Sequence, residues 1–390
     1  MRALIIDSGQ GRGALAAARG LASAGWTVGM GGPTRAGLPM LSFAVRHRHL
    51  IPPLNGGTRA FLLGIERAIV ARRYDVVFGC SDGEIVTLSR ERSRIGARVA
   101  YPRHDVTLRA IDKGELGTAA REVGIASPPV AASADEARER WGAGPTIVKE
   151  RVHGSAHVGL GVFLDPASVD RCVQEMRAAG AVPLIQPLLE GRLMAFTSVL
   201  DEHGRMLARV QQVAERTYPR TAGLSVRAET VAVDEQLAEQ VSLLLRRLGW
   251  FGLSELQFVL PGSGPPILLD LNGRFYGSLA LAIAAGVNLP DIWARIATGR
   301  MPVQAGDARP GVRYQWLEGD LRAARERSRG ALRDLAGCLR YGTGVSAGIW
   351  SARDPLPGLL TACTLLSEAA RRVAGGRVYR RGRALRVPHG

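Results

Sequence analysis

The sequence predicts a protein of mixed α/β and α+β class, and three observations support that prediction. Over residues 1–110, short apolar strands alternate with helical patterns, as in Rossmann-like β-α-β domains. After residue 111 the pattern changes to successive strands, paired strands and separate helices. Residues 301–390 are rich in Arg and mostly helical in pattern. We therefore expect a parallel-sheet domain, a larger α+β domain and a C-terminal extension.

The first domain is predicted from its apolar runs and helical periodicity. Buried parallel strands are expected at 3–7, 27–30, 75–80 and 98–101. Helices are expected at 13–24 and 58–73, and the Gly- and Pro-punctuated stretch 31–57 is expected to be a long loop. Ser81 and Asp82 follow the third strand, where they either cap a helix or line a cleft.

The second domain is predicted in the same way, and the sequence holds no internal repeat. Helices are expected at 112–123, 134–141, 166–179, 235–248, 279–285 and 290–298. Strands are expected at 146–149, 184–187, 252–260 and 266–272, with several more between 193 and 232. A Pro-Gly-Ser-Gly-Pro turn joins the strands 252–260 and 266–272, so these two are expected to pair.

The formal net charge of +16 comes almost entirely from Arg, which supplies 49 of the 51 basic residues. With abundant Ala and Gly, this bias is typical of a GC-rich genome. The Arg residues are spread along the chain and only 5% of residues are aromatic, which argues against nucleic acid as the main partner. A basic nucleic-acid-binding protein stays open as an alternative.

Lys113 and Lys149 are the only lysines in the chain. Where Arg has replaced Lys almost everywhere, a retained Lys indicates a place where a planar guanidinium does not fit, unless it survives by chance. A compact ammonium that contacts a phosphate in a tight pocket is one such place. Lys149 ends a strand just before the glycine-containing loop 153–161, whose backbone N–H groups suit a triphosphate.

A glycine-rich loop at the N-terminus offers a different function. Gly9, Gly11 and Ala14 formally match the dinucleotide-binding fingerprint G-x-G-x-x-[GA] between a strand and a helix. No acid lies between Asp7 and Glu66 to hold a ribose, although Arg35 could meet a 2′-phosphate. An NADP-dependent oxidoreductase is therefore an alternative, and a tight strand-to-helix turn is preferred. His47 and His49 lack a third ligand, so a metal site there is not expected.

Oxygen-bearing side chains gather on the paired strands near residue 270. Asp270 and Asn272 lie two apart on one strand and so share a face, and Gln257 faces them from the adjacent strand. Such hard oxygen donors suit Mg²⁺, which shares its coordination with phosphates. Arg274 continues that face towards a transferred phosphoryl group, although a buried Asp–Arg pair is the simpler interpretation.

Several segments together resemble the ATP-grasp superfamily, of the carboxylate–amine ligase type that is similar to carbamoyl-phosphate synthetase and biotin carboxylase. The resemblance covers about residues 1–300, and its motifs are specific only as a set. It rests on Lys113, Pro145-x-x-Val-Lys149, Ile185-Gln-Pro-Leu-Leu-Glu-Gly191, Asp270-Leu-Asn-Gly-Arg-Phe-Tyr-Gly-Ser278 and the apolar helix that follows.

The resemblance implies a Rossmann-like domain at 1–110, an ATP-grasp domain at 111–300 with a lid subdomain at about 125–187, and an Arg-rich extension at 301–390. ATP would lie between two subdomains, with the loop that contains Ser155 closing over its phosphates. Lys113 and Lys149 would hold phosphates. Adenine would be bound by the hinge that includes Gln186, through the Pro187 carbonyl and the Leu189 N–H, and ribose by Glu190.

The sequence departs from the family pattern at three places. Arg192 and Leu193 stand where an acid often follows the hinge glycine, which puts the ribose contact in doubt. Asp270 stands where Glu is usual, and the shorter side chain would shift one metal. Gly273 replaces a common Pro.

The implied function is an ATP-dependent carboxylate–amine ligase that uses Mg²⁺ or Mn²⁺, forms an acyl phosphate and releases ADP and phosphate. Arg274 would stabilise the transferred phosphoryl group, and Arg216 would hold a substrate anion. A bicarbonate-using enzyme of the carboxylase or carbamoyl-phosphate type is the alternative, although the chain has no biotin-carrier Met-Lys-Met motif and encodes no glutaminase.

Four cysteines lie far apart without a Cys-x-x-Cys pair, which indicates a reduced cytoplasmic chain and no zinc framework. The chain opens without a signal-peptide core, and its apolar runs are too short for a transmembrane segment. The expected partners are a small-molecule carboxylate and an amine, with no nucleic acid. A homodimer is the assembly that general frequency favours.

Overall fold

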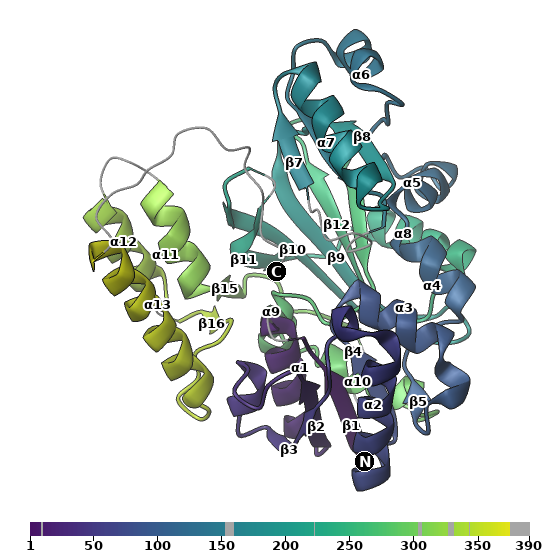
Figure 1. The fold of residues 1–390 in the computed structure, drawn as a ribbon, viewed down its shortest axis with the longest axis vertical. Coiled ribbons are helices and arrows are strands. Elements are labelled where there is room, and N and C mark those ends of the chain that lie inside the picture. Colours follow the sequence, from purple (N-terminus) through teal and green to yellow (C-terminus); the bar gives the residue numbers. More distant parts are fainter. Residues whose placement is uncertain are drawn as a thin grey trace.

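The computed structural model describes residues 1–8, 11–152, 160–221, 223–302, 306–326, 331–342 and 344–374. Figure 1 shows a sheet near the N-terminus at the bottom, a small subdomain at the top and three C-terminal helices at the left, around a large central sheet. Among the described helices, none is both long and apolar enough to span a membrane.

The N-terminal region is a five-stranded sheet in which every pairing is parallel, in the order β3-β2-β1-β4-β5. Its strands are β1 (Arg2–Ile6), β2 (Thr27–Gly32), β3 (Val45–Leu50), β4 (Val76–Gly79) and β5 (Arg98–Val99). Its helices are α1 (Arg12–Ser23), α2 (Thr58–Arg72) and α3 (Asp82–Arg90). The central strands β1 and β4 are buried because helices and neighbouring strands cover them.

Strand β3 corrects the prediction that 31–57 is one long loop. It is an edge strand with the sequence VRHRHL, in which most side chains reach solvent. Charged edge strands lack the apolar run that reveals central strands, which explains the omission. His47 and His49 share a face, but His49 Nε2 lies 2.6 Å from Tyr74 Oη, and the described residues contain no group of three or more His, Cys, Asp or Glu that could hold a metal.

Helix α4 (His104–Ile111) was also missed, since the first helix after residue 101 was predicted to begin at 112. Asp112 instead separates α4 from α5 (Lys113–Glu122) and caps α5 by accepting from the N–H groups of Gly114 and Glu115. This cap places Lys113 at the first position of α5.

A separate three-stranded antiparallel sheet lies within the residues predicted to form a lid. Its order is β7-β6-β8, with β6 (Thr146–Glu150), β7 (Leu160–Phe163) and β8 (Pro183–Pro187). Helices α6 (Ala134–Trp141) and α7 (Pro166–Ala178) pack on it and enclose a small core of their own. In Figure 1 this subdomain stands above the central sheet.

The central sheet has eight strands, in the order β13-β12-β9-β10-β11-β15-β16 with β14 paired to β10. The long strands are β9 (Arg192–Leu200), β10 (Met206–Tyr218), β11 (Leu224–Val231), β12 (Gly252–Leu260) and β13 (Ile267–Asn272). Helix α8 (Glu235–Leu248) covers it with an apolar face that includes Val241, Leu244 and Leu248. The helix begins at the Asp234 cap and ends at Gly249 in the left-handed region.

The predicted C-terminal extension contributes to this same sheet. Its strands β14 (Gly306–Asp307), β15 (Arg313–Gln315) and β16 (Ser346–Ala347) pair within it, and helices α11 (Leu317–Glu326), α12 (Ala331–Tyr341) and α13 (Leu356–Ala374) lie beside it (Figure 1). Residues 375–390, the end of the predicted Arg-rich extension, lie outside the described residues.

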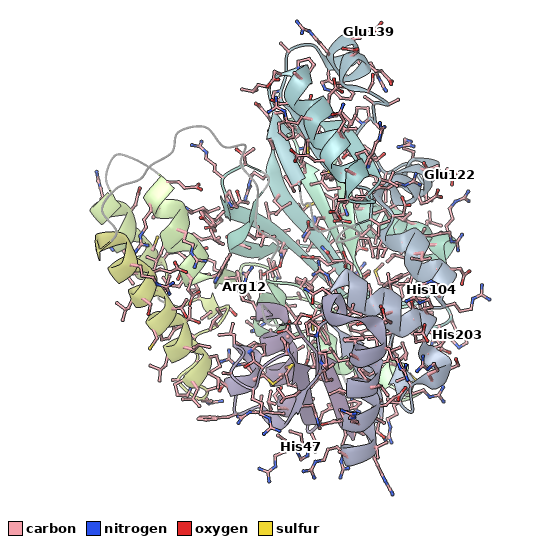
Figure 2. The ribbon with its side chains drawn as sticks, viewed as in Figure 1. Arg12, His47, His104, Glu122, Glu139 and His203 are labelled. Atoms are coloured by element: carbon pink, nitrogen blue, oxygen red, sulfur yellow. The ribbon has the colours of Figure 1, made fainter. Side chains whose placement is uncertain are left out.

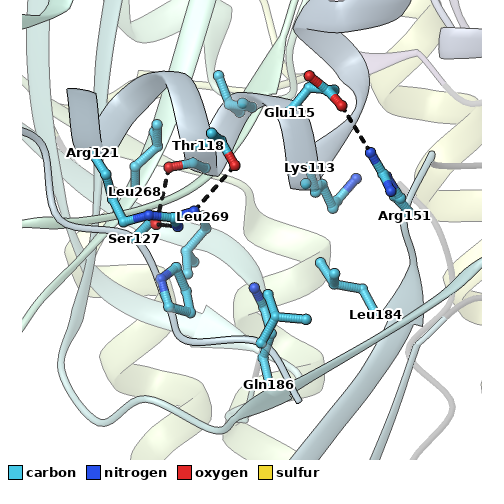
Figure 3. A pocket seen from close by; sticks show the side chains of 15 residues that line it. Lys113, Glu115, Thr118, Arg121, Ser127, Arg151, Leu184, Gln186, Leu268 and Leu269 are labelled. Atoms are coloured by element: carbon cyan, nitrogen blue, oxygen red, sulfur yellow. Dashed lines mark hydrogen bonds and ion pairs between the residues drawn. The ribbon is translucent and has the colours of Figure 1, made fainter. Parts of the chain in front are cut away.

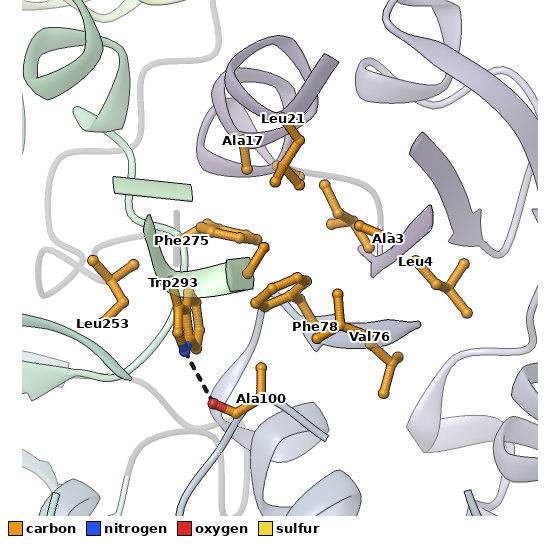
Figure 4. Packing of buried hydrophobic residues seen from close by; sticks show 14 of the residues in the cluster. Ala3, Leu4, Ala17, Leu21, Val76, Phe78, Ala100, Leu253, Phe275 and Trp293 are labelled. Atoms are coloured by element: carbon orange, nitrogen blue, oxygen red, sulfur yellow. Dashed lines mark hydrogen bonds between the residues drawn. The ribbon is translucent and has the colours of Figure 1, made fainter. Parts of the chain in front are cut away.

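An aromatic cluster joins the N-terminal sheet to the segment that follows β13 (Figure 4). Phe275 and Trp293, the latter from α10 (Leu289–Ala297), pack against Phe78 of β4 with ring centroids 4.7–5.1 Å apart. Trp293 also donates its indole N–H to the carbonyl of Ala100 at 3.0 Å. The two regions therefore share one core, which fixes residue 274 relative to the first domain.

Candidate active site

A cleft of about 650 Å³ opens between the three-stranded sheet and the central sheet. It is lined by residues from β6, β8, β9, β10, β12, β13 and the N-terminus of α1. The predicted site residues that line it are Lys113, Lys149, Gln186, Pro187, Leu189, Glu190, Gln257, Asp270, Asn272 and Arg274. Of the other two, Ser155 lies outside the described residues, and Arg216 does not line the cleft.

The predicted metal-binding residues meet on the β12–β13 hairpin. Gln257 is directly opposite Asp270 in the strand register, and Glu255 is directly opposite Asn272. Side chains two apart on a strand point to the same face, so these four polar groups form one square. The structure therefore brings Gln257, Asp270 and Asn272 together, and adds Glu255.

Glu255 is a site residue that sequence reasoning missed. Its Oε2 accepts hydrogen bonds from Asn272 Nδ2 at 2.9 Å and from Gln257 Nε2 at 3.3 Å. Because Glu255 takes the N–H ends of both amides, their carbonyl oxygens are left for other partners. Burial raises the pKa of Glu255 to about 7, against the opposing charge of Arg274. The sequence did contain a signal for Glu255, because Glu255 and Gln257 have the same two-residue spacing as Asp270 and Asn272.

The oxygen donors of this hairpin fit magnesium. Mg²⁺ commonly binds through one or two carboxylates while phosphates and water complete its coordination. The hairpin offers the carboxylate of Asp270 and the amide oxygens of Gln257 and Asn272, beside a second carboxylate at Glu255. A site with so few carboxylates suits a metal ion that binds together with a nucleotide better than it suits a permanently bound metal ion.

The two lysines approach this hairpin from different elements. Lys113 Nζ lies 3.2 Å from Asp270 Oδ2, and its side chain is only 7% exposed. Lys149 projects from β6 into the same cleft. The pKa of Lys149 is lowered to about 8, mainly by burial and also by the charge of Lys113, while the charge of Asp270 opposes the shift. Two buried ammonium groups with one nearby carboxylate form a site for a polyanion.

Arg274 links the hairpin to the N-terminal sheet. Its Nε donates to Asp82 Oδ1 at 2.9 Å, and Asp82 lies in the first turn of α3. Ser81 and Glu84 form a capping box at the start of this helix, so the cap interpretation of Ser81 is confirmed. Neither Ser81 nor Asp82 is among the residues that line the cleft, but Asp82 contacts the cleft residue Arg274.

The predicted hinge includes the end of β8 and the residues that follow it. Pro187 pairs with Thr146 in the register of β6 and β8, and the Leu188 N–H donates to the carbonyl of Pro145 at 2.8 Å. These contacts hold the segment after β8 against β6, and residues 187–190 line the cleft. The predicted hinge therefore lines the same cleft as the two lysines and the β12–β13 hairpin.

Arg216 is not brought into the cleft. Its Nη1 lies 2.8 Å from Asp320 Oδ1, and Arg227 Nε lies 2.7 Å from the other oxygen of the same carboxylate. Asp320 is fully buried on α11, and a buried carboxylate requires such partners. Arg216 thus ties β10 to α11, and the neighbouring residues Thr217 and Arg220 line the cleft in its place.

A smaller cavity of about 280 Å³ lies behind Lys113 (Figure 3) and shares Lys113 and Gln186 with the cleft. Its basic residues are already paired: Arg151 contacts Asp112 and Glu115, and Arg121 donates to Ser127. This cavity therefore offers less free charge than the main cleft.

The glycine-rich N-terminal turn serves close packing in this structure. A Cβ on Gly13 would lie 2.7 Å from the Phe275 carbonyl oxygen, so only Gly lets α1 approach the segment after β13. Arg12, beside it, lines the cleft and is 8% exposed. Its role is visible only from tertiary packing, because nothing in its local sequence separates it from 48 other arginines.

A family model matches part of this chain. Residues 182–320 match a family model described as ATP-grasp in the biosynthetic pathway with Ter operon. A search of curated protein sequences finds no match.

Solved structures share the fold at low sequence identity. Biotin carboxylase from Campylobacter jejuni, in complex with β-γ-ATP, has a TM-score of 0.61 at 15% identity, over 76% of this chain and 71% of that one. N5-carboxyaminoimidazole synthetase from Staphylococcus aureus, complexed with ADP, has a TM-score of 0.60 at 13% identity, over 80% of each chain. L-amino acid ligase from Bacillus licheniformis has a TM-score of 0.57 at 13% identity, over 80% of this chain and 78% of that one.

Proposed function

We propose that this chain is an ATP-grasp enzyme, namely an ATP-dependent carboxylate–amine ligase that releases ADP and phosphate, because residues 182–320 match an ATP-grasp family model and its fold is shared with biotin carboxylase and L-amino acid ligase. The observation that carries the proposal is the convergence of distant residues on one cleft. Lys113 and Lys149 meet the Gln257, Asp270 and Asn272 hairpin, although more than a hundred residues separate them in sequence. A polyanion site beside oxygen donors for Mg²⁺ is what a magnesium–nucleotide complex requires.

The first half-reaction transfers the γ-phosphoryl group of ATP to a substrate carboxylate. A carboxylate oxygen forms the new bond to phosphorus as the bond to the ADP oxygen breaks, which gives an acyl phosphate and ADP. Lys113, Lys149 and Arg274 supply positive charge to the phosphates, and Gln257, Asp270 and Asn272 would hold Mg²⁺ or Mn²⁺. The metal would neutralise charge on the phosphate oxygens.

The second half-reaction forms the amide. The amine nitrogen bonds to the acyl carbon, the bond from that carbon to the phosphate oxygen breaks, and phosphate leaves with its electron pair and takes up the proton of the amine. Water must be excluded until the amine arrives, because it would hydrolyse the acyl phosphate. The predicted lid, with Ser155 in its loop, would provide this closure, and Pro187, Leu189 and Glu190 would hold the adenosine.

The proposal is tested by ADP and phosphate release with ATP and Mg²⁺ across pooled carboxylates and amines, with Asp270→Ala as the control variant. Turnover that requires both a carboxylate and an amine, and is lost in the variant, supports the ligase. Turnover with bicarbonate alone would replace it with the carboxylase-type alternative. A parent protein that fails to bind ATP–Mg²⁺ would contradict both.

A further inference from the structure

The central sheet places a polar side chain at a fixed distance from the metal-binding hairpin. Gln257 on β12 is opposite Ala195 on β9, and Ala195 is opposite Gln212 on β10. Asp270, Gln257, Ala195 and Gln212 therefore form one row across four strands, and all four line the cleft. Gln212 lies two strand spacings from Gln257, or about 10 Å.

Gln212 presents an unused hydrogen-bond acceptor in this row. Its Nε2 donates to Ser278 Oγ at 2.7 Å, whereas its Oε1 is buried and has no hydrogen-bond partner among the described residues. The side chain is only 4% exposed. A buried polar atom without a partner is costly, so a ligand that donates an N–H at this place gains affinity. Ala195, between Gln212 and the hairpin, is small and leaves room for that ligand.

Arg12 supplies a positive charge at the same end of the cleft. Its guanidinium lies 3.6 Å from the ring centroid of Trp316 and donates to Tyr314 Oη at 3.2 Å. These contacts hold a 92%-buried cation in place, and within the part of the chain that the structure describes it forms no ion pair with a carboxylate. Figure 2 labels Arg12 where α1 meets the C-terminal helices. Burial raises the pKa of the nearby Glu318 carboxyl, and the charge of Arg12 opposes that rise, but no direct ion pair joins the two, so an anionic ligand can still bind the guanidinium.

Arg12 and Gln212 both approach the segment Gly277–Ser278. A Cβ added to Gly277 would be 2.9 Å from Arg12 Nη2, and Ser278 receives the hydrogen bond from Gln212. Both side chains also line the same cleft, so one small molecule can contact the two. Other residues that line this cleft carry hydroxyl groups or positive charge, among them Thr217, Arg220, Thr221 and Ser225.

We propose that the amine substrate is an amino acid, which donates its amine N–H to Gln212 Oε1 and places its carboxylate against Arg12. The inference rests on the proposed ligase function and names the substrate class of the same site. The spacing of the row sets the amine beside the acyl phosphate held at the hairpin, while the carboxylate of the amino acid stays at Arg12 and does not react.

The test compares free L-amino acids with the same amino acids as C-terminal carboxamides, which keep the amine and lose the anion. ADP release is measured with ATP, Mg²⁺ and pooled carboxylates, for the parent protein and for Arg12→Met, Arg12→Lys and the control Arg59→Met, an exposed residue on α2. We expect the carboxamides to have kcat/KM at least about tenfold lower than the free amino acids. Arg12→Met should raise KM for free amino acids at least about tenfold and remove the preference, with partial rescue in Arg12→Lys.

Two further measurements separate this inference from the proposed function. ATP–Mg²⁺ affinity, measured by calorimetry, should stay within about twofold of the parent in Arg12→Met, and loss of nucleotide binding in the parent itself would count against the ligase. Free amino acids are also titrated directly into the parent loaded with ADP–Mg²⁺. Equal use of carboxamides, an unchanged KM in Arg12→Met, or no binding of any free amino acid would overturn the amino-acid site.

Discussion

Arg274 Nε lies 2.9 Å from Asp82 Oδ1, so a residue just after the β12–β13 hairpin is held by the first helix turn after β4. Both side chains are largely buried, at 16% and 8% exposed. The N-terminal region thus contacts a residue of the candidate site through a side chain, in addition to packing beside it.

Asp82→Asn should lower kcat while leaving ATP–Mg²⁺ affinity little changed. The neutral amide no longer balances the buried Arg274, which is then free to turn towards Glu255 and Asp270. We expect a loss of about tenfold or more in ADP release, with nucleotide binding by calorimetry within about threefold of the parent. Asp105→Asn, which removes an exposed carboxylate paired with Arg103, is the matched control. An equal loss in both variants would argue against a role for the Asp82 contact.

Glu255→Gln should weaken metal-dependent nucleotide binding. A Gln at this place offers one acceptor oxygen and a competing NH₂ group, so the amides of Gln257 and Asn272 are no longer both held with their oxygens outward. Loss of such a supporting contact typically costs about 10- to 100-fold in metal affinity. The Mn²⁺ concentration that gives half-maximal ATP binding reports the change, and the exposed Glu239→Gln serves as control. An unchanged Mn²⁺ requirement would remove Glu255 from the site.

ATP affinity should fall as pH rises above about 8. Lys149 has a pKa of about 8 without nucleotide, and bound phosphates favour its charged form, so binding takes up a proton at higher pH. Affinity is then nearly constant below pH 8 and decreases by up to about tenfold per pH unit above it.

The Lys149→Arg variant keeps a positive charge at position 149 throughout this pH range. Its affinity should be lower overall, since the larger guanidinium fits less well, but flat between pH 7.5 and about 9.5. Calorimetric titration of ATP–Mg²⁺ at several pH values checks both proteins. The same pH slope in parent and variant would assign the effect to another group.

Gly273→Ala should destabilise the fold. The Cβ would meet the ring of Trp250, which is 2% exposed and donates its indole N–H to the Leu253 carbonyl at 3.1 Å. Overpacking of a filled core costs about 1–3 kcal/mol, which urea denaturation would measure. Gly262→Ala, where no heavy atom lies within 4 Å of the new Cβ, should change stability by no more than about 0.5 kcal/mol. The ring of Trp250 also explains why Gly stands here in place of the Pro that the family pattern suggests.

Much of the architecture could be predicted from local sequence, because it depends on local patterns. Helix α8 carries a strong apolar stripe between an Asp cap and a terminal Gly, and β12 is a continuous β-prone run. The charged edge strand β3 gave no such pattern. Its neighbours in the sheet, and not its own composition, make it a strand.

Some residues of the candidate site could likewise be predicted from local sequence, and others could not. Asp270, Asn272 and Gln257 were found because strand periodicity places them on one face, and the two lysines were found because the chain has no others. Arg12 depends on Trp316 and Tyr314, about three hundred residues away, and only the folded chain brings them together. Arg216 was expected to hold a substrate anion, but the buried carboxylate of Asp320 binds it instead.

The aromatic cluster of Phe78, Phe275 and Trp293 also limits which sequence changes this protein can accept during evolution. Two of its three rings come from the second half of the chain, although they fill the interior of the first. In a chimera that receives residues 1–110 from a relative, Phe275 would pack against a different side chain. Because Phe275 directly follows Arg274, this change would also shift Arg274. We therefore expect new substrate specificities to arise by point substitutions in the cleft, because exchanging the first domain would disrupt the core that it shares with the rest of the chain.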